Sequence, residues 1–195
     1  MSPYFSDRFL TAFTMAYKLH GEQMRKASQT PYLAHLMTVA SMVMENGGSE
    51  DQAIAALLHD AVEDAGGIPT LDMIREEFGE YVAELVDGCT DSYTQPKEDW
   101  KLRKIAYLEK LKKASNDVKL ISLADKVHNA RSIVRDLHRT GDQTWDKFKG
   151  KKTGTLWYYH SLAKVFDDTP YTLLKNELRN LEDEMQTLVN LMESS

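Results

Sequence analysis

Four side chains that can bind a metal ion or move protons follow an uninterrupted apolar run. Residues 53–58 read Ala-Ile-Ala-Ala-Leu-Leu, and the ionisable residues that come next are His59, Asp60, Glu63 and Asp64. Positions three and four apart share a helix face, so overlapping pairs of these groups would lie on about one turn. Burying them costs free energy unless a partner compensates, and a divalent cation is the simplest partner. The alternative is a solvated helix end on which His59 packs and the carboxylates are exposed.

A second acidic interruption occurs in the apolar stretch that begins at Val118. Asp125 and Asn129 are four residues apart and would face the same way on a helix. An aspartate in mid-helix has poor helix propensity and a burial cost, which suggests a functional role. A surface pairing of Asp125 with Lys126 or Arg131 is the alternative interpretation.

One further histidine would complete a set of metal ligands. His35 lies in the first turn of an expected helix, and its imidazole can point into the same space as that of His59. A lone histidine at this position would be expected to pack in the core. Two imidazoles and two carboxylates together suit Mn²⁺, Fe²⁺ or Zn²⁺ better than Mg²⁺ or Ca²⁺. The candidate ligands are His35, His59, Asp60 and Asp125.

The elements that would position these groups are helical almost throughout. Glycine and proline are scarce, at 10 and 5 of 195 residues, and the apolar spacing has a helical period. No alternating run predicts a strand. We therefore expect an all-α bundle of about nine to ten helices. The clearest are expected at about 9–20, 33–45, 49–64, 70–78, 80–88, 100–114, 118–137, 155–166 and 171–191.

Some of these helices carry more detailed expectations. In the helix that begins near residue 100, the spacing assigns Leu102, Ile105, Leu108 and Leu111 to the core. Thr70 is expected to cap the helix that follows the Gly-Gly-Ile-Pro break. Residues 142–154 are expected to be irregular and basic.

The bulk composition fits one globular domain. Hydrophobic residues make up 42% and charged residues 28% of the chain. We expect a single domain over 1–195, with a core over about 5–168 and a C-terminal helix and tail over 171–195. The formal charge of −6 argues against nucleic acid or an anionic membrane as the main partner, although a local basic pocket can still bind a small anion. One cysteine and the lack of a signal or membrane-spanning pattern lead us to expect a cytoplasmic protein.

The ordered set of His35, His59-Asp60 and Asp125 resembles the HD superfamily of metal-dependent phosphohydrolases. The chain is more closely similar to the hydrolase domain of RelA/SpoT proteins, and among these to the stand-alone small alarmone hydrolases, which include the metazoan SpoT homologues. This resemblance covers about residues 5–168. The matching segments are Arg25-Lys26, Pro31-Tyr32 with His35, Leu58-His59-Asp60-Ala61-Val62-Glu63-Asp64, and Leu123-Ala124-Asp125-Lys126 with Asn129 and Arg131.

The resemblance implies a reaction and a set of roles. The reaction is Mn²⁺-dependent removal of pyrophosphate from the 3′ position of ppGpp or pppGpp, which yields GDP or GTP. One Mn²⁺ per chain would be bound by the four candidate ligands, and Glu63 and Asp64 would handle the attacking water. Lys97 is equally well explained as a solvated loop residue, and Tyr158 as a core residue. The substrate contacts that the resemblance implies are Arg25, Lys26, Lys97, Asn129, Arg131, Lys151 and Tyr158.

Two positions depart from the family pattern, and several alternatives stay open. Ala65 follows the Glu-Asp pair where threonine is usual, and Leu36 follows the first histidine where proline is frequent. Neither removes a ligand. The loop between Arg25 and His35 varies in length among members and can alter which base is accepted, so (p)ppApp is an alternative substrate. Another HD-type nucleotide phosphohydrolase, a nucleotide-binding module without turnover, and a homodimer are also compatible with the sequence.

Overall fold

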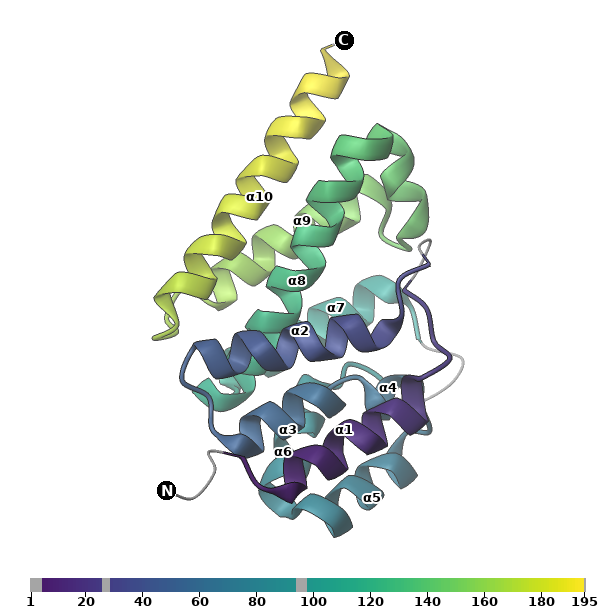
Figure 1. The fold of residues 1–195 in the computed structure, drawn as a ribbon. Helices are drawn as coiled ribbons and strands as arrows, with labels where there is room; N and C mark the ends of the chain where they lie inside the picture. The colour runs from purple at the N-terminus through teal and green to yellow at the C-terminus, as the bar shows by residue number, and fades with distance from the viewer. Residues whose placement is uncertain (1–4, 26–28, 94–97, 195) are drawn as a thin grey trace.

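The computed structural model describes residues 5–25, 29–93 and 98–194 (Figure 1). Within these ranges the chain forms α-helices and one 3₁₀ helix, and the only extended pairing is a single bridge between Met24 and Pro31. The predicted all-α fold class is therefore confirmed. No helix in the described part of the chain is both long and apolar enough to cross a membrane.

The elements are separated by connections of different lengths. In chain order they are α1 (Asp7–His20), α2 (Tyr32–Glu45), α3 (Glu50–Leu58), α4 (Ala61–Asp64), α5 (Ile68–Phe78), α6 (Glu80–Cys89), α7 (Trp100–Lys113), α8 (Asn116–Thr140), the 3₁₀ helix η1 (Gly141–Lys147), α9 (Lys151–Val165) and α10 (Thr172–Glu193).

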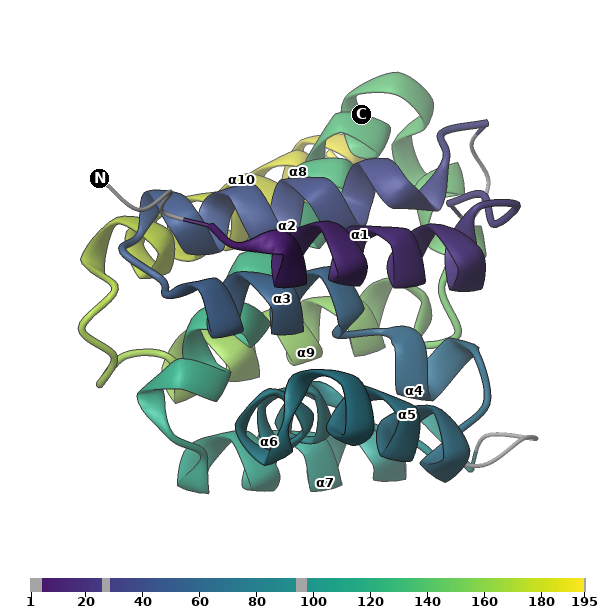
Figure 2. The same cartoon turned by 60° about the horizontal axis from the view of Figure 1, so that its bottom comes forward.

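The long helix α8 organises the bundle. It contacts α2 and α3 on one side and α10 along much of its length, and α10 also packs on α9. The N-terminal helices form the other part of the molecule, where α3 contacts α1, α2 and α6. Figure 2 shows this part from below, with α1 in front of α3 and with α6 and α7 beneath. The candidate metal ligands and catalytic acids lie on α8 itself, on helices that precede it in the chain, or in the connection between two of these helices.

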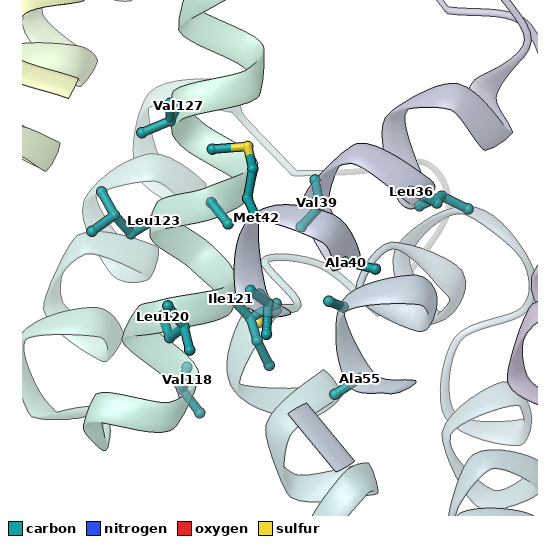
Figure 3. Packing of buried hydrophobic residues seen from close by; sticks show 14 of the residues in the cluster. Leu36, Val39, Ala40, Met42, Ala55, Val118, Leu120, Ile121, Leu123 and Val127 are labelled. Carbon is teal, nitrogen blue, oxygen red and sulfur yellow. The ribbon is translucent and has the colours of Figure 1, made fainter. Parts of the chain in front are cut away.

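The contact between α2 and α8 is apolar and fully buried. Figure 3 shows the Met42 side chain extending from α2 toward α8, which carries Leu123 and Val127, and none of these three side chains is more than 4% exposed. On α2 the buried positions recur every three or four residues, which places them on one face, whereas α8 is buried on all sides from Val118 to Asp125. This packing fixes α2, which carries His35, against the helix that carries Asp125.

The predicted helix over 49–64 is interrupted, which corrects the expectation of one continuous segment. The expected capping box is present between Ser49 and Gln52, but α3 ends at Leu58 and α4 begins at Ala61. A helix that stops leaves its last carbonyl groups without partners. Here the His59 Nδ1 atom lies 2.8 Å from the Ala56 carbonyl oxygen and donates to it, so the side chain compensates for the break.

The prediction of which residues of the 100–114 helix face the core is partly wrong. Leu108 and Leu111 are buried, but Leu102 is 63% and Ile105 44% exposed. Four residues spaced by three turn through about half of a helix circumference, so they cannot all face one neighbour. The buried face of α7 instead comprises Arg103, Tyr107, Leu108 and Leu111.

Two other boundaries differ from those expected. The helix expected to be capped by Thr70 begins at Ile68, and the Thr70 hydroxyl instead donates to the Ala65 carbonyl oxygen at 2.7 Å. The segment over 142–154 is more regular than its composition suggested, because η1 covers its first part and α9 begins at Lys151.

Candidate metal centre and active site

The four predicted ligands meet at the junction of three parts of the fold. His35 comes from α2, His59 and Asp60 from the break between α3 and α4, and Asp125 from α8. The His35 Nε2 atom lies 3.3 Å from Asp125 Oδ1 and 3.6 Å from Asp60 Oδ2. The His59 Nε2 atom lies 3.0 Å from Asp60 Oδ2 and 3.8 Å from Asp125 Oδ1. The predicted convergence of these residues is therefore present in the structure.

The donor atoms fit a single divalent cation. In a neutral His59 ring the single proton is on Nδ1, where it is donated to the Ala56 carbonyl, so the Nε2 atom carries the lone pair. That Nε2 atom is buried and has no hydrogen-bond partner among the described residues. One donor atom each from His35, His59 and Asp125 lies within 4.8 Å of the others, and all three residues are buried. Nitrogen and oxygen donors so arranged are typical of sites for transition-metal ions.

The electrostatics of the pocket also favour a cation. Burial acts to raise the pKa of Asp125, but the Lys126 ammonium and the nearby imidazoles of His35 and His59 hold it well below its usual range. Burial acts in the same way on Asp60, where His59 outweighs it and lowers the pKa. The two carboxylates raise the pKa of His59 well above its usual value, against the effect of burial. Two ionised carboxylates in a buried pocket would attract a metal ion as they attract a proton.

Hydrogen bonds orient both carboxylate ligands. The Tyr32 hydroxyl donates to Asp60 Oδ2 at 2.5 Å, and burial followed by the charge of Asp60 strongly raises the pKa of this phenol. Asn129 Nδ2 donates to Asp125 Oδ1 at 2.5 Å, as their shared helix face predicted. Lys126 Nζ donates to the other oxygen of Asp125 at 2.6 Å. This pair lies inside the site, with the Lys126 side chain only 14% exposed, and not on the surface as the alternative interpretation required.

Glu63 and Asp64 lie on α4, one turn beyond the ligands Asp60 and His59. Asp64 is exposed and accepts a hydrogen bond from Gln23 Nε2 at 3.1 Å. Glu63 is partly buried and hydrogen-bonds to the carboxyl group of Asp91. The two acids thus have different surroundings, one open to solvent and one tied to a buried partner.

Asp91 belongs to a buried ionic cluster behind Glu63. Arg103 Nη1 and Lys104 Nζ each lie 2.5 Å from one of its two carboxylate oxygens, and its side chain is 4% exposed. Burial acts to raise the pKa of Asp91, but Lys104, Glu63 and Arg103 lower it to about 2. The cluster therefore joins the end of α6 to the first turn of α7 beside the candidate active site.

Of the predicted substrate contacts, Arg25 and Asn129 are brought to the metal centre. Arg25 Nη2 donates to Asn129 Oδ1 at 2.8 Å, while Asn129 also holds Asp125. Lys26 and Lys97 lie outside the described residues. The positions of these two lysines relative to the site therefore stay predictions.

The other predicted substrate contacts have partners elsewhere. Arg131 Nε donates to Glu177 of α10 at 2.5 Å. Lys151 is exposed and pairs with Asp146 at 3.1 Å. Tyr158 is 6% exposed, as the core interpretation expected, and its buried hydroxyl has no hydrogen-bond partner in the described part of the chain. Its ring lies 5.0 Å from Lys104 Nζ, which places it next to the Asp91 cluster.

Sequence reasoning missed several residues that contact the site. Gln23 and Asp91 lie in connections, where no periodicity indicates a direction for the side chain. Tyr32 belongs to one of the segments that match the family, but the resemblance assigns it no role. His128 lies three residues after Asp125 on the same face of α8, and the sequence predicts it only as a structural neighbour of the ligands.

Comparison with known proteins identifies the family of this chain. A family model described as the HD domain matches residues 12–156. The guanosine-3′,5′-bis(diphosphate) 3′-pyrophosphohydrolase MESH1 of Homo sapiens is 37% identical over 184 residues, which cover 93% of this chain and 92% of that protein. The MESH1 protein of Xenopus tropicalis is 38% identical over 141 residues, or 71% of this chain and 74% of that one. A solved structure described as a metazoan orthologue of SpoT that hydrolyses ppGpp superposes with a TM-score of 0.74 at 28% identity, covering 92% of this chain and 96% of the other. The chain belongs to the HD domain family.

Proposed function

We propose that this protein is a metal-dependent hydrolase that removes the 3′-pyrophosphate of ppGpp or pppGpp. The observation that carries the proposal is the convergence of the buried residues His35, His59 and Asp125 with the partly buried Asp60, and a pair of acids one turn away. The proposal is supported by the human and frog relatives, whose names describe this reaction and which align with most of this chain. A substrate of this kind is a small anionic nucleotide, which an acidic protein can bind through a local cluster of cations.

Our proposal for the metal is one Mn²⁺ per chain, held by His35, His59, Asp60 and Asp125. The mixed imidazole and carboxylate donor set and the buried lone pair of His59 support a transition-metal ion. When bound, such an ion supplies Lewis-acid polarisation of a phosphoryl oxygen and acidifies water. The residues around the site then orient the ligands and transfer protons.

The two acids of α4 are proposed to manage the proton of the attacking water. Water adds to the phosphorus atom bonded to the ribose 3′ oxygen, the bond between that oxygen and phosphorus breaks, and pyrophosphate leaves. One proton passes from the water to a carboxylate, and the 3′ oxygen gains one proton. Asp64 is solvent-exposed and oriented by Gln23, which suits a proton acceptor, while Glu63 is held from behind by Asp91.

The substrate is proposed to bind across Arg25 and Asn129 beside the metal centre. The Arg25 guanidinium can stack on a purine or pair with a phosphate, and its bond to Asn129 keeps it near the ligand Asp125. Lys26, Lys97 and Tyr158 remain proposed contacts. Arg131 and Lys151 would exchange Glu177 and Asp146 for phosphate oxygens, which is feasible because both ion pairs are partly or fully exposed.

The test is an assay of purified protein loaded with Mn²⁺ against ppGpp, ppApp and GTP in parallel, with identification of each product. We expect pyrophosphate and GDP from ppGpp. Faster release from ppApp would select the adenine nucleotide as the substrate. Release of inorganic phosphate from GTP without activity on the 3′-diphosphates would instead indicate another HD-type phosphohydrolase. Nucleotide binding without any product would contradict the proposal and favour a binding module.

A further inference from the structure

His128 lies directly behind one of the candidate metal ligands. Its Nδ1 atom is 2.7 Å from the Nδ1 atom of His35, which is a hydrogen-bonding distance. The two rings are stacked, with centroids 4.9 Å apart and an interplanar angle of 28°. His128 also belongs to α8, three residues after Asp125, so one helix supplies both a ligand and this contact. The proposed reaction assigns no role to His128.

The proton between the two imidazoles can have only one arrangement if His35 binds a metal. Two bare ring nitrogens would repel each other at 2.7 Å, so one of them carries the hydrogen. The Nε2 atom of His35 is the one that faces Asp60 and Asp125, so it must be unprotonated to coordinate a cation. The proton of a neutral His35 is then on Nδ1, and the Nδ1 atom of His128 accepts it.

We propose that His128 is a positioning residue that holds His35 in the Nδ1-protonated tautomer and at the correct ring angle for metal binding. The inference rests on the proposed metal centre. A ligand histidine whose second nitrogen donates to a fixed acceptor is a stronger and better oriented donor. His128 must itself carry its proton on Nε2, since its Nδ1 atom is the acceptor.

The other candidate ligand histidine, His59, is oriented in the same way but by a different hydrogen-bond acceptor. His59 is held by the Ala56 carbonyl oxygen at 2.8 Å, which can only accept. His35 is held by a side chain that can either accept or donate at the same nitrogen. The orientation of one imidazole ligand is therefore fixed by the backbone of α3, and that of the other by a replaceable residue of α8.

The test measures metal affinity and not turnover. We would determine the dissociation constant of Mn²⁺ by calorimetry for the wild type, His128→Phe, His128→Asn and a control, His138→Phe, whose ring is exposed and pairs with Glu184. Phenylalanine keeps the aromatic volume but accepts no hydrogen bond, and we expect roughly 10- to 100-fold weaker binding. Asparagine can place its Oδ1 atom near the position of Nδ1, so we expect its affinity to lie within a few-fold of the wild type. The control should bind like the wild type.

A spectroscopic readout separates positioning from a general loss of structure. In the Zn²⁺-loaded wild type, long-range ¹H–¹⁵N spectra should show His35 protonated on Nδ1 and His128 on Nε2. Equal Mn²⁺ affinity of His128→Phe and the wild type, or the opposite tautomer of His128, would overturn the inference while leaving the metal centre intact. Failure of the wild type to bind any of these ions would overturn the inference and the proposed metal centre together. If His128→Phe does not fold, the His128→Asn variant is used instead, and Mn²⁺ binding that is tenfold or more weaker than in the wild type would contradict the inference. The tautomers of His35 and His128 in the wild type test the inference without any variant.

Discussion

The Tyr32 hydroxyl donates to the same Asp60 oxygen that faces both ligand histidines. It fixes the direction of this carboxylate from the first residue of α2, so the helix that supplies His35 also orients a ligand from another segment. A buried phenol at this distance would be costly without its acceptor, which makes the pair mutually dependent.

Replacing Tyr32 by phenylalanine is expected to weaken Mn²⁺ binding by about tenfold. The ring would still pack between His20 and His35, but Asp60 would lose its oriented donor. The measurement is the Mn²⁺ dependence of binding and of activity. Tyr17→Phe is the matched control, because that ring is 59% exposed. Identical Mn²⁺ titration curves for Tyr32→Phe and the wild type would show that the hydrogen bond does not orient the ligand.

The residues that converge at the candidate site could be predicted from the sequence, whereas the residues that orient them could not. His35, His59, Asp60 and Asp125 interrupt apolar segments, and this costs free energy unless the groups are used. Gln23 and Asp91 sit in connections whose course depends on tertiary packing, so no local rule places them near Asp64 and Glu63.

At the scale of elements, the break between α3 and α4 is what turns His59 and Asp60 toward the metal centre. An uninterrupted apolar run followed by acids gives no indication of a break, because alanine and leucine favour a continuous helix. The compensating bond from His59 to the Ala56 carbonyl is visible only in three dimensions.

The Asp91 cluster joins the end of α6 to α7, and its effect on stability should depend on pH. The pKa of Asp91 is lowered from 3.8 to about 2 in the folded protein. A carboxyl group whose pKa is lower in the folded than in the unfolded protein stabilises the folded state when the pH is above the unfolded pKa. This stabilisation is lost as the pH falls toward the folded pKa. Asp91→Asn should therefore reduce the free energy of unfolding by about 2 kcal/mol at pH 7 and by about half as much at pH 3.

Urea unfolding of the wild type and Asp91→Asn at several pH values measures this difference. Asp72→Asn is the control, since Asp72 pairs with Arg75 on the surface and should change the free energy by less than about 1 kcal/mol. A difference between Asp91→Asn and the wild type that stays constant from pH 7 to pH 3 would contradict the assigned pKa.

The orientation of α7 can be tested with two leucines that the sequence treats alike. Leu111 is fully buried, and Leu111→Ala should cost about 2–5 kcal/mol of stability. Leu102 is 63% exposed, and Leu102→Ala should change stability by less than about 0.5 kcal/mol. Denaturant unfolding of both variants gives the comparison, and similar losses would mean that α7 is rotated from the described orientation.

For the whole molecule, the prediction of a single domain over 1–195 depends on how α10 packs. Leu174, Leu178, Met185 and Val189 of this helix are buried against the rest of the bundle. Without α10, the predicted core over 5–168 would leave exposed the side of α8 that contacts α10. We therefore expect α10 to unfold together with the other helices.

Met185→Ala is expected to destabilise the protein by about 2–5 kcal/mol, because the Met185 side chain is fully buried. Circular dichroism and tryptophan fluorescence should shift together to one lower transition, since all three tryptophans lie outside α10. Gln186→Ala on the exposed face is the control. A fluorescence transition that does not move in Met185→Ala would show that α10 unfolds separately.

The fold class could be predicted because helical periodicity is a local property that runs through the whole chain. How the helices pack could not, because α10 carries apolar residues that suit a partner chain as well as its own α8. The structure places that face on α8 and α9 of the same chain.

The most direct test of the account is pyrophosphate release from ppGpp by chelator-treated protein before and after addition of Mn²⁺. We predict that activity of the wild type returns as about one equivalent of Mn²⁺ per chain is added. Asp125→Ala should remain lower by about 1,000-fold or more, which corresponds to about 4 kcal/mol of transition-state stabilisation. The surface variant Asp183→Ala should behave like the wild type. Undiminished release by Asp125→Ala, or by the wild type without any metal, would contradict the proposed centre.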